Sequence, residues 1–338
     1  MTEHRSTNHT THQIVVCGLS DRGLQRANNE DHFMVADLTR QVIGVHDNQL
    51  LSDLLHYDVG MRGTVLMVAD GLGGHEGGEI ASQLAVNTVA QALLDTAEQD
   101  RPVSEQLIRA IGRAHEVICA YHDAPGYSRR MASTLTAVHV GHGVMTIAQV
   151  GDSRAYRFSA GKLTLLTEDQ TVVSVLQKKG MLTAEEAQHH PHRNVILQAL
   201  GQDKSVLPEI QTLPLQHNDC LLLCSDGLSS YVAHERIEAI MASGEEEHVR
   251  CRRLVEEANA AGGADNVTVL LARLITRDDT YSEATGPPPG RSVQGVEKRS
   301  LPWRVQDEKP HTAPANAPVK VPFWKRRIRW SWRDKAAR

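Results

Sequence analysis

The sequence predicts an α+β protein with antiparallel sheet, and three patterns support that class. After Met131, alternation of period two runs through 132–140, 144–158 and 162–167, with a tight Ala160-Gly161 turn before the last stretch. Residues between Gly78 and Asp123 instead follow the spacing of amphipathic helices. Two uniformly apolar runs each end in Asp-Gly, which is typical of buried strands that terminate at a polar edge.

Composition limits the classes of function. The chain has 338 residues, 41% of them hydrophobic and 23% charged, as in ordinary globular proteins. The net charge of -5 divides into about +7 for 277–338 and about -12 for the rest. An acidic body suits divalent cations and disfavours nucleic acid. The composition changes near 276, so we expect a polar, disordered 1–13, a catalytic domain over 14–276 and a disordered, Pro-rich tail over 277–338.

The five cysteines have no spacing typical of a secreted disulfide framework, which indicates buried free thiols in a reducing compartment. The start of the chain has no apolar signal region, and no stretch reaches about 18 apolar residues. We therefore expect a cytoplasmic protein.

The first elements can be placed in order. A short strand is expected over 14–19, followed by a loop dense in donors and carboxylates, which taken alone favours a solvated loop. Residues 38–62 show little periodicity and suggest an extended surface loop. The apolar run from Thr64 predicts a strand buried on both faces that ends at Asp70.

Two helices are expected next. The first carries Ile80, Leu84, Val89 and Leu93 at near-helical spacing. The second follows Pro102, and we place His115 on its surface or edge. Its apolar face is expected to comprise Leu107, Ile111, Ala114, Ile118 and Tyr121.

The remaining elements follow the period-two strands. Residues 168–201 favour helix, with a capping box from Thr183 to Glu186. A strand over 220–224 leads to Asp226-Gly227, helices are expected around 237–241 and 254–258, and a final strand follows Asp265.

Four aspartates stand at the edges of apolar strands: Asp70, Asp152, Asp226 and Asp265. Each taken alone would more often form a turn. Four in one domain indicate oxygen ligands for hard cations such as Mg²⁺ or Mn²⁺. The glycines after Asp70 do not match a P-loop or G-x-G-x-x-G, and His75-Glu76 lacks the second His of H-E-x-x-H.

These residues resemble the metal-dependent protein phosphatases of type 2C, in their bacterial form. The motifs SDRGLQRANNED, VADGLGGHEGGEIAS, STLTAV, VGDSRAY, CSDGLS and ADNVTV occur in that family's order over about 14–276. The resemblance implies a four-layer αββα sandwich, in which helices flank two antiparallel sheets, and a dinuclear Mn²⁺ or Mg²⁺ site at one end of the sheets.

The resemblance also implies ligand roles. Asp70 would bridge two ions, the Gly71 carbonyl would bind the second, and Asp226 and Asp265 would complete the first. Asp152, together with Asp226, matches a weaker third site in bacterial members.

Other positions would act around those ions. Glu30 would act through water, Arg26 would hold the substrate phosphate, and His75 is a candidate general acid. A flap over about 168–200 would gate substrates. The implied activity is hydrolysis of phosphoserine and phosphothreonine in proteins by a hydroxide that bridges the metals.

Two alternatives stay open: a catalytically weak regulatory or binding protein on the same fold, and a hydrolase of small phosphate esters. The expected partners are phosphorylated proteins, including a Ser/Thr kinase or its substrates, and the expected state is a monomer. Residues 319–338 mix tryptophan with Lys and Arg, which favours docking to an anionic membrane surface, peripheral at the inner membrane, or to an acidic partner. Apart from this basic segment, nothing supports nucleic-acid binding.

Overall fold

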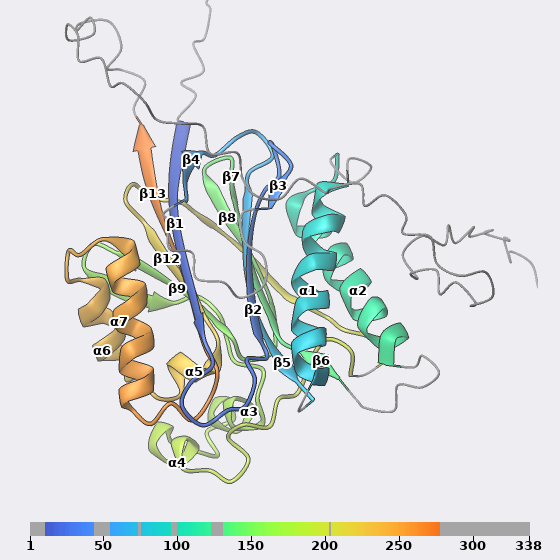
Figure 1. Cartoon of the computed structure of the whole chain (residues 1–338), viewed down its shortest axis with the longest axis vertical. Coiled ribbons are helices and arrows are strands. Elements are labelled where there is room, and N and C mark those ends of the chain that lie inside the picture. The colour runs from blue at the N-terminus through green and yellow to red at the C-terminus, as the bar shows by residue number, and fades with distance from the viewer. Residues whose placement is uncertain are drawn as a thin grey trace, which may run out of the picture. The chain divides into compact units, whose positions relative to one another are not determined.

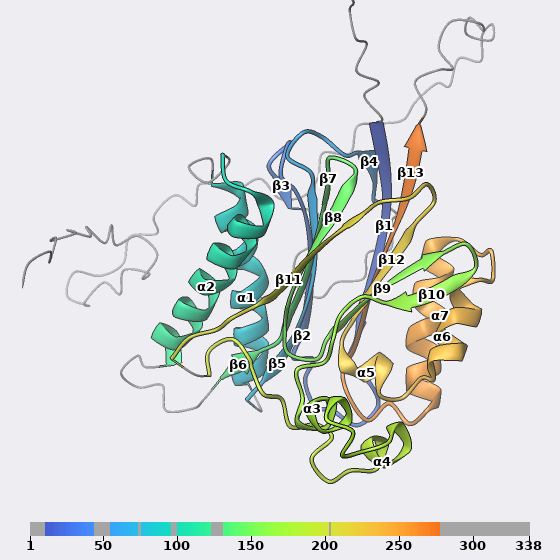
Figure 2. The same ribbon diagram turned by 180° about the vertical axis from the view of Figure 1, so that it is seen from behind.

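A computed structural model describes residues 11–43, 55–73, 76–95, 100–122, 131–202 and 204–277. In this part of the chain two antiparallel sheets face each other, and helices cover the outer face of each sheet (Figures 1 and 2). The predicted α+β class and the four-layer αββα order are therefore confirmed.

The first sheet has six strands. Its order is β10 (Lys162–Leu165), β9 (Arg154–Ser159), β12 (Cys220–Cys224), β13 (Val267–Arg277), β1 (Thr11–Asp21) and β4 (Leu55–Asp58). The long pair β1 and β13 joins the two ends of the domain in one register, from Thr11 opposite Arg277 to Asp21 opposite Val267. This pairing extends β1 beyond the predicted 14–19, so the expected boundary after residue 13 falls inside a strand.

The second sheet has seven strands. Its main order is β11 (Glu209–Pro214), β8 (Val144–Val150), β7 (Leu135–Gly141), β5 (Thr64–Leu72), β2 (Asp31–Asp37) and β3 (Val42–Ile43), and β6 (Ala132–Ser133) pairs with the end of β5. Strand β5 lies in the middle of this sheet, which explains why its sequence is apolar without alternation: both of its faces are covered.

Three apolar clusters hold the layers together. Helices α1 (Glu76–Leu94) and α2 (Val103–His122) pack on the seven-stranded sheet. Helices α6 (His234–Met241) and α7 (Glu247–Ala260) pack on the six-stranded sheet. Side chains from both sheets, including Val68 and Leu270, fill the space between them.

Short helices occur near one end of the sheets. Helix α5 (Asp226–Ser229) follows β12 directly, while α3 (Val172–Lys178) and α4 (Ala184–Gln188) lie in the connection from β10 to β11 (Figure 2). Thr183 and Glu186 form the predicted capping box of α4, so this local prediction is confirmed.

Several local predictions were wrong. Residues 38–62 are not all loop, because they contribute β3 and β4, which pair with β2 and β1. His115 is buried, and its Nδ1 accepts a hydrogen bond of 3.1 Å from the backbone N–H of Gly201. Tyr121 lies outside the apolar face of α2 and is exposed. Strand β11 was not predicted at all.

All five cysteines are free, and four of them are buried. Among the described helices, none has the length and apolar character needed to cross a bilayer. The predicted tail, 277–338, lies outside the described residues except for Arg277, which ends β13.

Candidate metal centre

Five aspartates lie at one end of the two sheets, where strands from both sheets begin or end. Asp70 is near the end of β5, and Asp31, the first residue of β2, is its cross-strand neighbour. Asp152 occupies the turn from β8 to β9, Asp226 begins α5, and Asp265 precedes β13. Because neighbouring strands run in opposite directions, segments separated by about 40 to 230 residues meet at this edge (Figure 1).

The backbone of Asp70 is fixed by the Ser-Thr pair that follows Ala132. The Asp70 N–H donates to Thr134 Oγ1 at 2.9 Å, and the Asp70 carbonyl accepts from the Thr134 N–H at 2.9 Å. Ser133 Oγ also donates to that carbonyl, at 3.1 Å. The neighbouring Gly71 pairs with Ser133, in the register of β5 and β6. The position of Asp70 is thus set by contacts more than 60 residues away along the chain.

Asp31 belongs to this cluster, although its sequence context indicated only a polar loop. It is 1% exposed, and its Oδ2 accepts a hydrogen bond of 2.6 Å from Ser225 Oγ. Burial and the neighbouring Asp226 and Asp265 raise the pKa of Asp31 to about 7, against the hydrogen bonds from Ser225 and Thr268. The sequence signal that could have identified Asp31 is its position directly before the apolar residues of β2. Asp70, in comparison, directly follows the apolar residues of β5.

The cluster concentrates negative charge in a partly buried space. Burial raises the pKa of Asp70 well above its usual range, and repulsion from the other four aspartates raises it further. Burial raises the pKa of Asp226 to about 6, with Asp265 adding to the shift and Asp70 and Arg26 opposing it. Burial and the charge of Asp226 raise the pKa of Asp152 to about 7. Cations or protons are therefore required to stabilise these groups together.

Arg26 and Asp265 form an ion pair on the rim of the cluster. The Arg26 Nη2 donates to Asp265 Oδ2 at 2.7 Å, and its Nε donates to the Ala264 carbonyl at 3.3 Å. Asp265 Oδ1 accepts from the Asn266 N–H at 2.9 Å. Each oxygen of Asp265 keeps a further lone pair for a cation. Arg26 is half exposed, so its remaining donors can reach an anion that arrives from solvent.

Glu30 is held beside Asp70 by Asn266 and Ser82, two residues that were not among the candidate site residues. Asn266 Oδ1 accepts from the Glu30 N–H at 2.8 Å, while Ser82 Oγ on α1 donates to the Glu30 carbonyl at 2.5 Å. A Cβ added at Gly78 would lie 2.1 Å from Glu30 Oε2. One added at Gly71 would lie 2.1 Å from the Gly78 carbonyl oxygen. Both glycines are therefore needed for this close approach.

The connection that carries α3 and α4 is anchored beside Asp152. The Gly151 N–H donates to Gln170 Oε1 at 2.8 Å, and the Gln170 N–H donates to the Gly151 carbonyl at 3.0 Å. Arg154 forms a forked pair with Asp169 through bonds of 2.8 and 2.6 Å. A movement of the segment 168–200 would thus act directly on the turn that holds Asp152.

The residues fit hard divalent cations. All available ligands are oxygens, and the Oδ1 atoms of Asp152 and Asp226 are buried without a hydrogen-bond partner in the described structure. No three His, Cys, Asp or Glu side chains of the described part converge as ligands of a single ion do. Any ion held by these carboxylates would therefore need backbone oxygen and water to complete its shell. His75 lies outside the described residues, so its proposed role as general acid stays a prediction.

Comparisons with known proteins agree with this geometry. The family model described as protein phosphatase 2C matches residues 44–258. The chain is 34% identical over 266 residues to the serine/threonine phosphatase stp of Listeria monocytogenes, which covers 77% of this chain and 95% of that protein. It is 36% identical over 260 residues to the serine/threonine protein phosphatase PstP of Mycobacterium tuberculosis, covering 77% of this chain and 45% of that protein.

Solved structures give the same picture. A crystal structure of the M. tuberculosis phosphatase PstP/Ppp superimposes with a TM-score of 0.64 at 33% identity, over 78% of this chain and 99% of the other. A second structure, the catalytic domain of PstP in complex with two manganese ions, gives a TM-score of 0.61 at 32% identity, over the same shares of the two chains.

Proposed function

The chain belongs to the protein phosphatase 2C family and is a metal-dependent protein serine/threonine phosphatase, and from this premise we propose how its own residues perform the reaction. The observation that carries the assignment of residues is the grouping of Asp70, Asp226 and Asp152 at one end of the sheets, where burial and, after it, neighbouring carboxylates raise the pKa of each carboxyl. Three such groups together are stabilised either by protons or by bound cations, and cations take that place when the groups are ionised near neutral pH.

A two-metal site agrees with the manganese complex of the related PstP domain. We assign Asp70 as the shared ligand, the Gly71 carbonyl to one ion, and Asp226 and Asp265 to the other. Asp152, with its unpartnered Oδ1, and Asp226 would hold a weaker third ion. Mn²⁺ and Mg²⁺ both suit this oxygen set. When bound, such ions lower the pKa of coordinated water and neutralise charge on phosphoryl oxygens.

The remaining steps belong to the protein. Arg26 orients the phosphoryl group, because its guanidinium lies at the open rim and is already aligned by Asp265. Glu30, fixed by Asn266 and Ser82, orients water beside Asp70. Asp31, opposite Asp70 in the sheet, adds a second carboxyl that Ser225 holds in place through a hydrogen bond of 2.6 Å. His75 stays the candidate that protonates the departing serine or threonine oxygen.

The test of this assignment is phosphate release from a phosphothreonine peptide with Mn²⁺. We expect Asp226→Ala to lower kcat/KM by at least ~100-fold. Removing a residue that only hydrogen-bonds a metal ligand already costs about 10–100-fold, and Asp226 is proposed as a ligand itself. Asp100→Ala is the matched control, because Asp100 is exposed in the turn before α2. Activity that survives chelation, or that Asp226→Ala leaves intact, would contradict the proposal, and exclusive turnover of small phosphate esters would favour the alternative hydrolase.

The natural substrates are phosphoproteins, and we propose that they include a Ser/Thr kinase or its targets. We also propose that the enzyme is a monomer and acts in the cytoplasm. The basic, tryptophan-containing sequence 319–338 supports docking at the inner membrane surface or on an acidic partner. A chain shortened after residue 277 should lose sedimentation with anionic vesicles and keep its activity on peptides. Equal sedimentation of both chains would refute the membrane proposal.

A further inference from the structure

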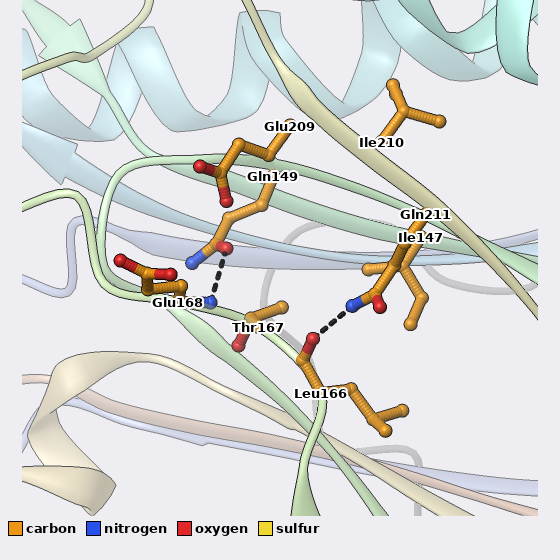
Figure 3. A pocket seen from close by; sticks show the side chains of 8 residues that line it. All are labelled: Ile147, Gln149, Leu166, Thr167, Glu168, Glu209, Ile210 and Gln211. Atoms are coloured by element: carbon orange, nitrogen blue, oxygen red, sulfur yellow. Dashed lines mark hydrogen bonds between the residues drawn. The ribbon is translucent and has the colours of Figure 1, made fainter.

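A cavity of about 300 Å³ lies beside the anchor of the segment 168–200, outside the metal centre. It lies where the edge strand β11 faces the chain that leaves β10 (Figure 3). Eight residues line it: Ile147, Gln149, Leu166, Thr167, Glu168, Glu209, Ile210 and Gln211.

The register of two strands determines the main wall of this cavity. Glu209 lies opposite Gln149, and Gln211 lies opposite Ile147, so these four side chains project from the same face of the sheet. The opposing wall is tied to them by two hydrogen bonds: Gln211 Nε2 donates to the Leu166 carbonyl, and the Glu168 N–H donates to Gln149 Oε1 at 3.1 Å (Figure 3). The walls of the cavity are therefore preformed.

The charge of the cavity is one-sided. Glu168 and Glu209 both line it, and no basic residue does. Lys178 pairs with Glu168 from outside the lining, whereas Glu209 is exposed and has no ion-pair partner among the described residues. Ile147 and Leu166 add apolar surface. This combination suits a long aliphatic stem that carries a cationic head, as in arginine or lysine.

The cavity is linked to the reacting centre by Gln149. Its Nε2 donates to the carbonyls of Gly151, at 3.3 Å, and Ser153, at 3.1 Å, which flank Asp152. Asp152 follows Gln149 by three residues, a stretch that spans at most about 10 Å and bends at Gly151. An extended phosphopeptide would cover such a distance with roughly three residues, and a path around the bend with up to about five.

We propose that this cavity binds an arginine or lysine side chain of the phosphoprotein substrate, three to five residues from the phosphorylated one, with Glu209 as its specificity-determining carboxylate. The inference rests on the proposed phosphatase function of the same chain. It predicts a preference for basic sequences around the phosphorylated residue that the metal centre alone would not produce.

The experiment compares phosphothreonine peptides that carry one arginine, three to five residues to either side, with the same peptides carrying glutamine. The full-length chain with Mn²⁺ should show a KM roughly two- to fivefold lower for the arginine peptide at the matching position, the range of a partly exposed ion pair. Glu209→Gln should remove most of this difference. Glu235→Gln, which removes an exposed carboxylate on α6, should retain it, and all three proteins should hydrolyse p-nitrophenyl phosphate equally.

A charge reversal provides an independent arm. Glu209→Arg should invert the preference, so that a peptide with glutamate at the matching position has the lower KM. Equal KM values for arginine and glutamine peptides in the unaltered chain, or a preference that survives both Glu209 variants, would overturn the inference. Failure of every peptide to be hydrolysed would instead refute the proposed function itself.

Discussion

Replacing Asn266 tests whether the loop between β1 and β2 is positioned by a single amide. Asn266 is buried and makes three side-chain hydrogen bonds to that loop: its Oδ1 accepts from the Glu30 N–H at 2.8 Å, and its Nδ2 donates to the carbonyls of Arg22 and Asn28 at 2.9 and 2.8 Å. The same loop carries Arg26. Asn266→Ala removes all three bonds.

The expected cost follows from these contacts. At a net contribution of about 1 kcal/mol for each bond, Asn266→Ala should lower the free energy of unfolding by about 3 kcal/mol. For a domain of this size, Tm should fall by roughly 6–12 °C. Asn259→Ala is a matched control, because Asn259 Nδ2 makes one bond, to Asp21 Oδ1 at 3.2 Å, and should cost about 1 kcal/mol.

Urea unfolding with Mn²⁺ measures the free energy of unfolding. Steady-state kinetics on a phosphothreonine peptide measure KM, which reports on the position of the loop between β1 and β2. We expect KM to rise for Asn266→Ala, since Arg26 and Glu30 would lose their common anchor, and to stay constant for Asn259→Ala. Equal unfolding free energies for the two variants, together with an unchanged KM, would refute the idea that Asn266 organises this side of the site.

Three further predictions concern other parts of the domain. Gly78→Ala should lower kcat/KM by about tenfold or more, because the new Cβ would lie 2.1 Å from Glu30 Oε2. Gly112→Ala is the control: its new Cβ has nothing within 4 Å, so it should leave the stability in thermal unfolding unchanged or raise it by roughly 0.5–1 kcal/mol. With chelator present, the free energy of unfolding should fall as the pH rises from 5 to 7.5. Burial and neighbouring carboxylates raise the pKa of Asp226 to about 6 and of Asp152 to about 7 in the folded state. The stability that protonation of these groups contributes is therefore fully present below about pH 4 and is lost as the pH rises through those values. Thr183→Ala should remove the cap of α4 and speed amide exchange there at a local cost of about 1 kcal/mol, with Tm unchanged.

Each of these has a result that would contradict it. Equal kinetics for Gly78→Ala and Gly112→Ala would show that Glu30 tolerates displacement. A flat or rising pH profile under chelation, or a profile that Mn²⁺ does not reverse, would show that the carboxylates do not compete for protons and cations. Unchanged exchange in α4 with Thr183→Ala would show that the capping box does not stabilise that helix.

Local patterns in the sequence predicted much of the fold and most of the candidate ligands. The uninterrupted apolar run before Asp70 indicated a strand covered on both faces, as β5 is. Helix α2 began just after Pro102, as expected, and Thr183 with Glu186 formed a capping box. These predictions succeeded because the signals lie within a few residues of the structure they determine.

Other features could not be predicted from such patterns. The period-two strands after Met131 suggested one meander, but β7 and β8 belong to one sheet while β9 and β10 belong to the other. Alternation shows which side chains share a face, and it does not show which sheet that face belongs to. Strand β11 was missed for a related reason, since only its pairing with β8 distinguishes it from loop.

The sequence by itself indicated the chemistry of this protein: candidate oxygen ligands at the ends of apolar strands, in an order that identifies a type 2C phosphatase. Only the tertiary structure decided how those ligands are supported. Asp31 joined the cluster through Ser225, 194 residues away, and Glu30 is held by Asn266, 236 residues away. Such contacts depend on packing the two sheets face to face, so the carboxylates are encoded locally while their positions are consequences of the whole fold.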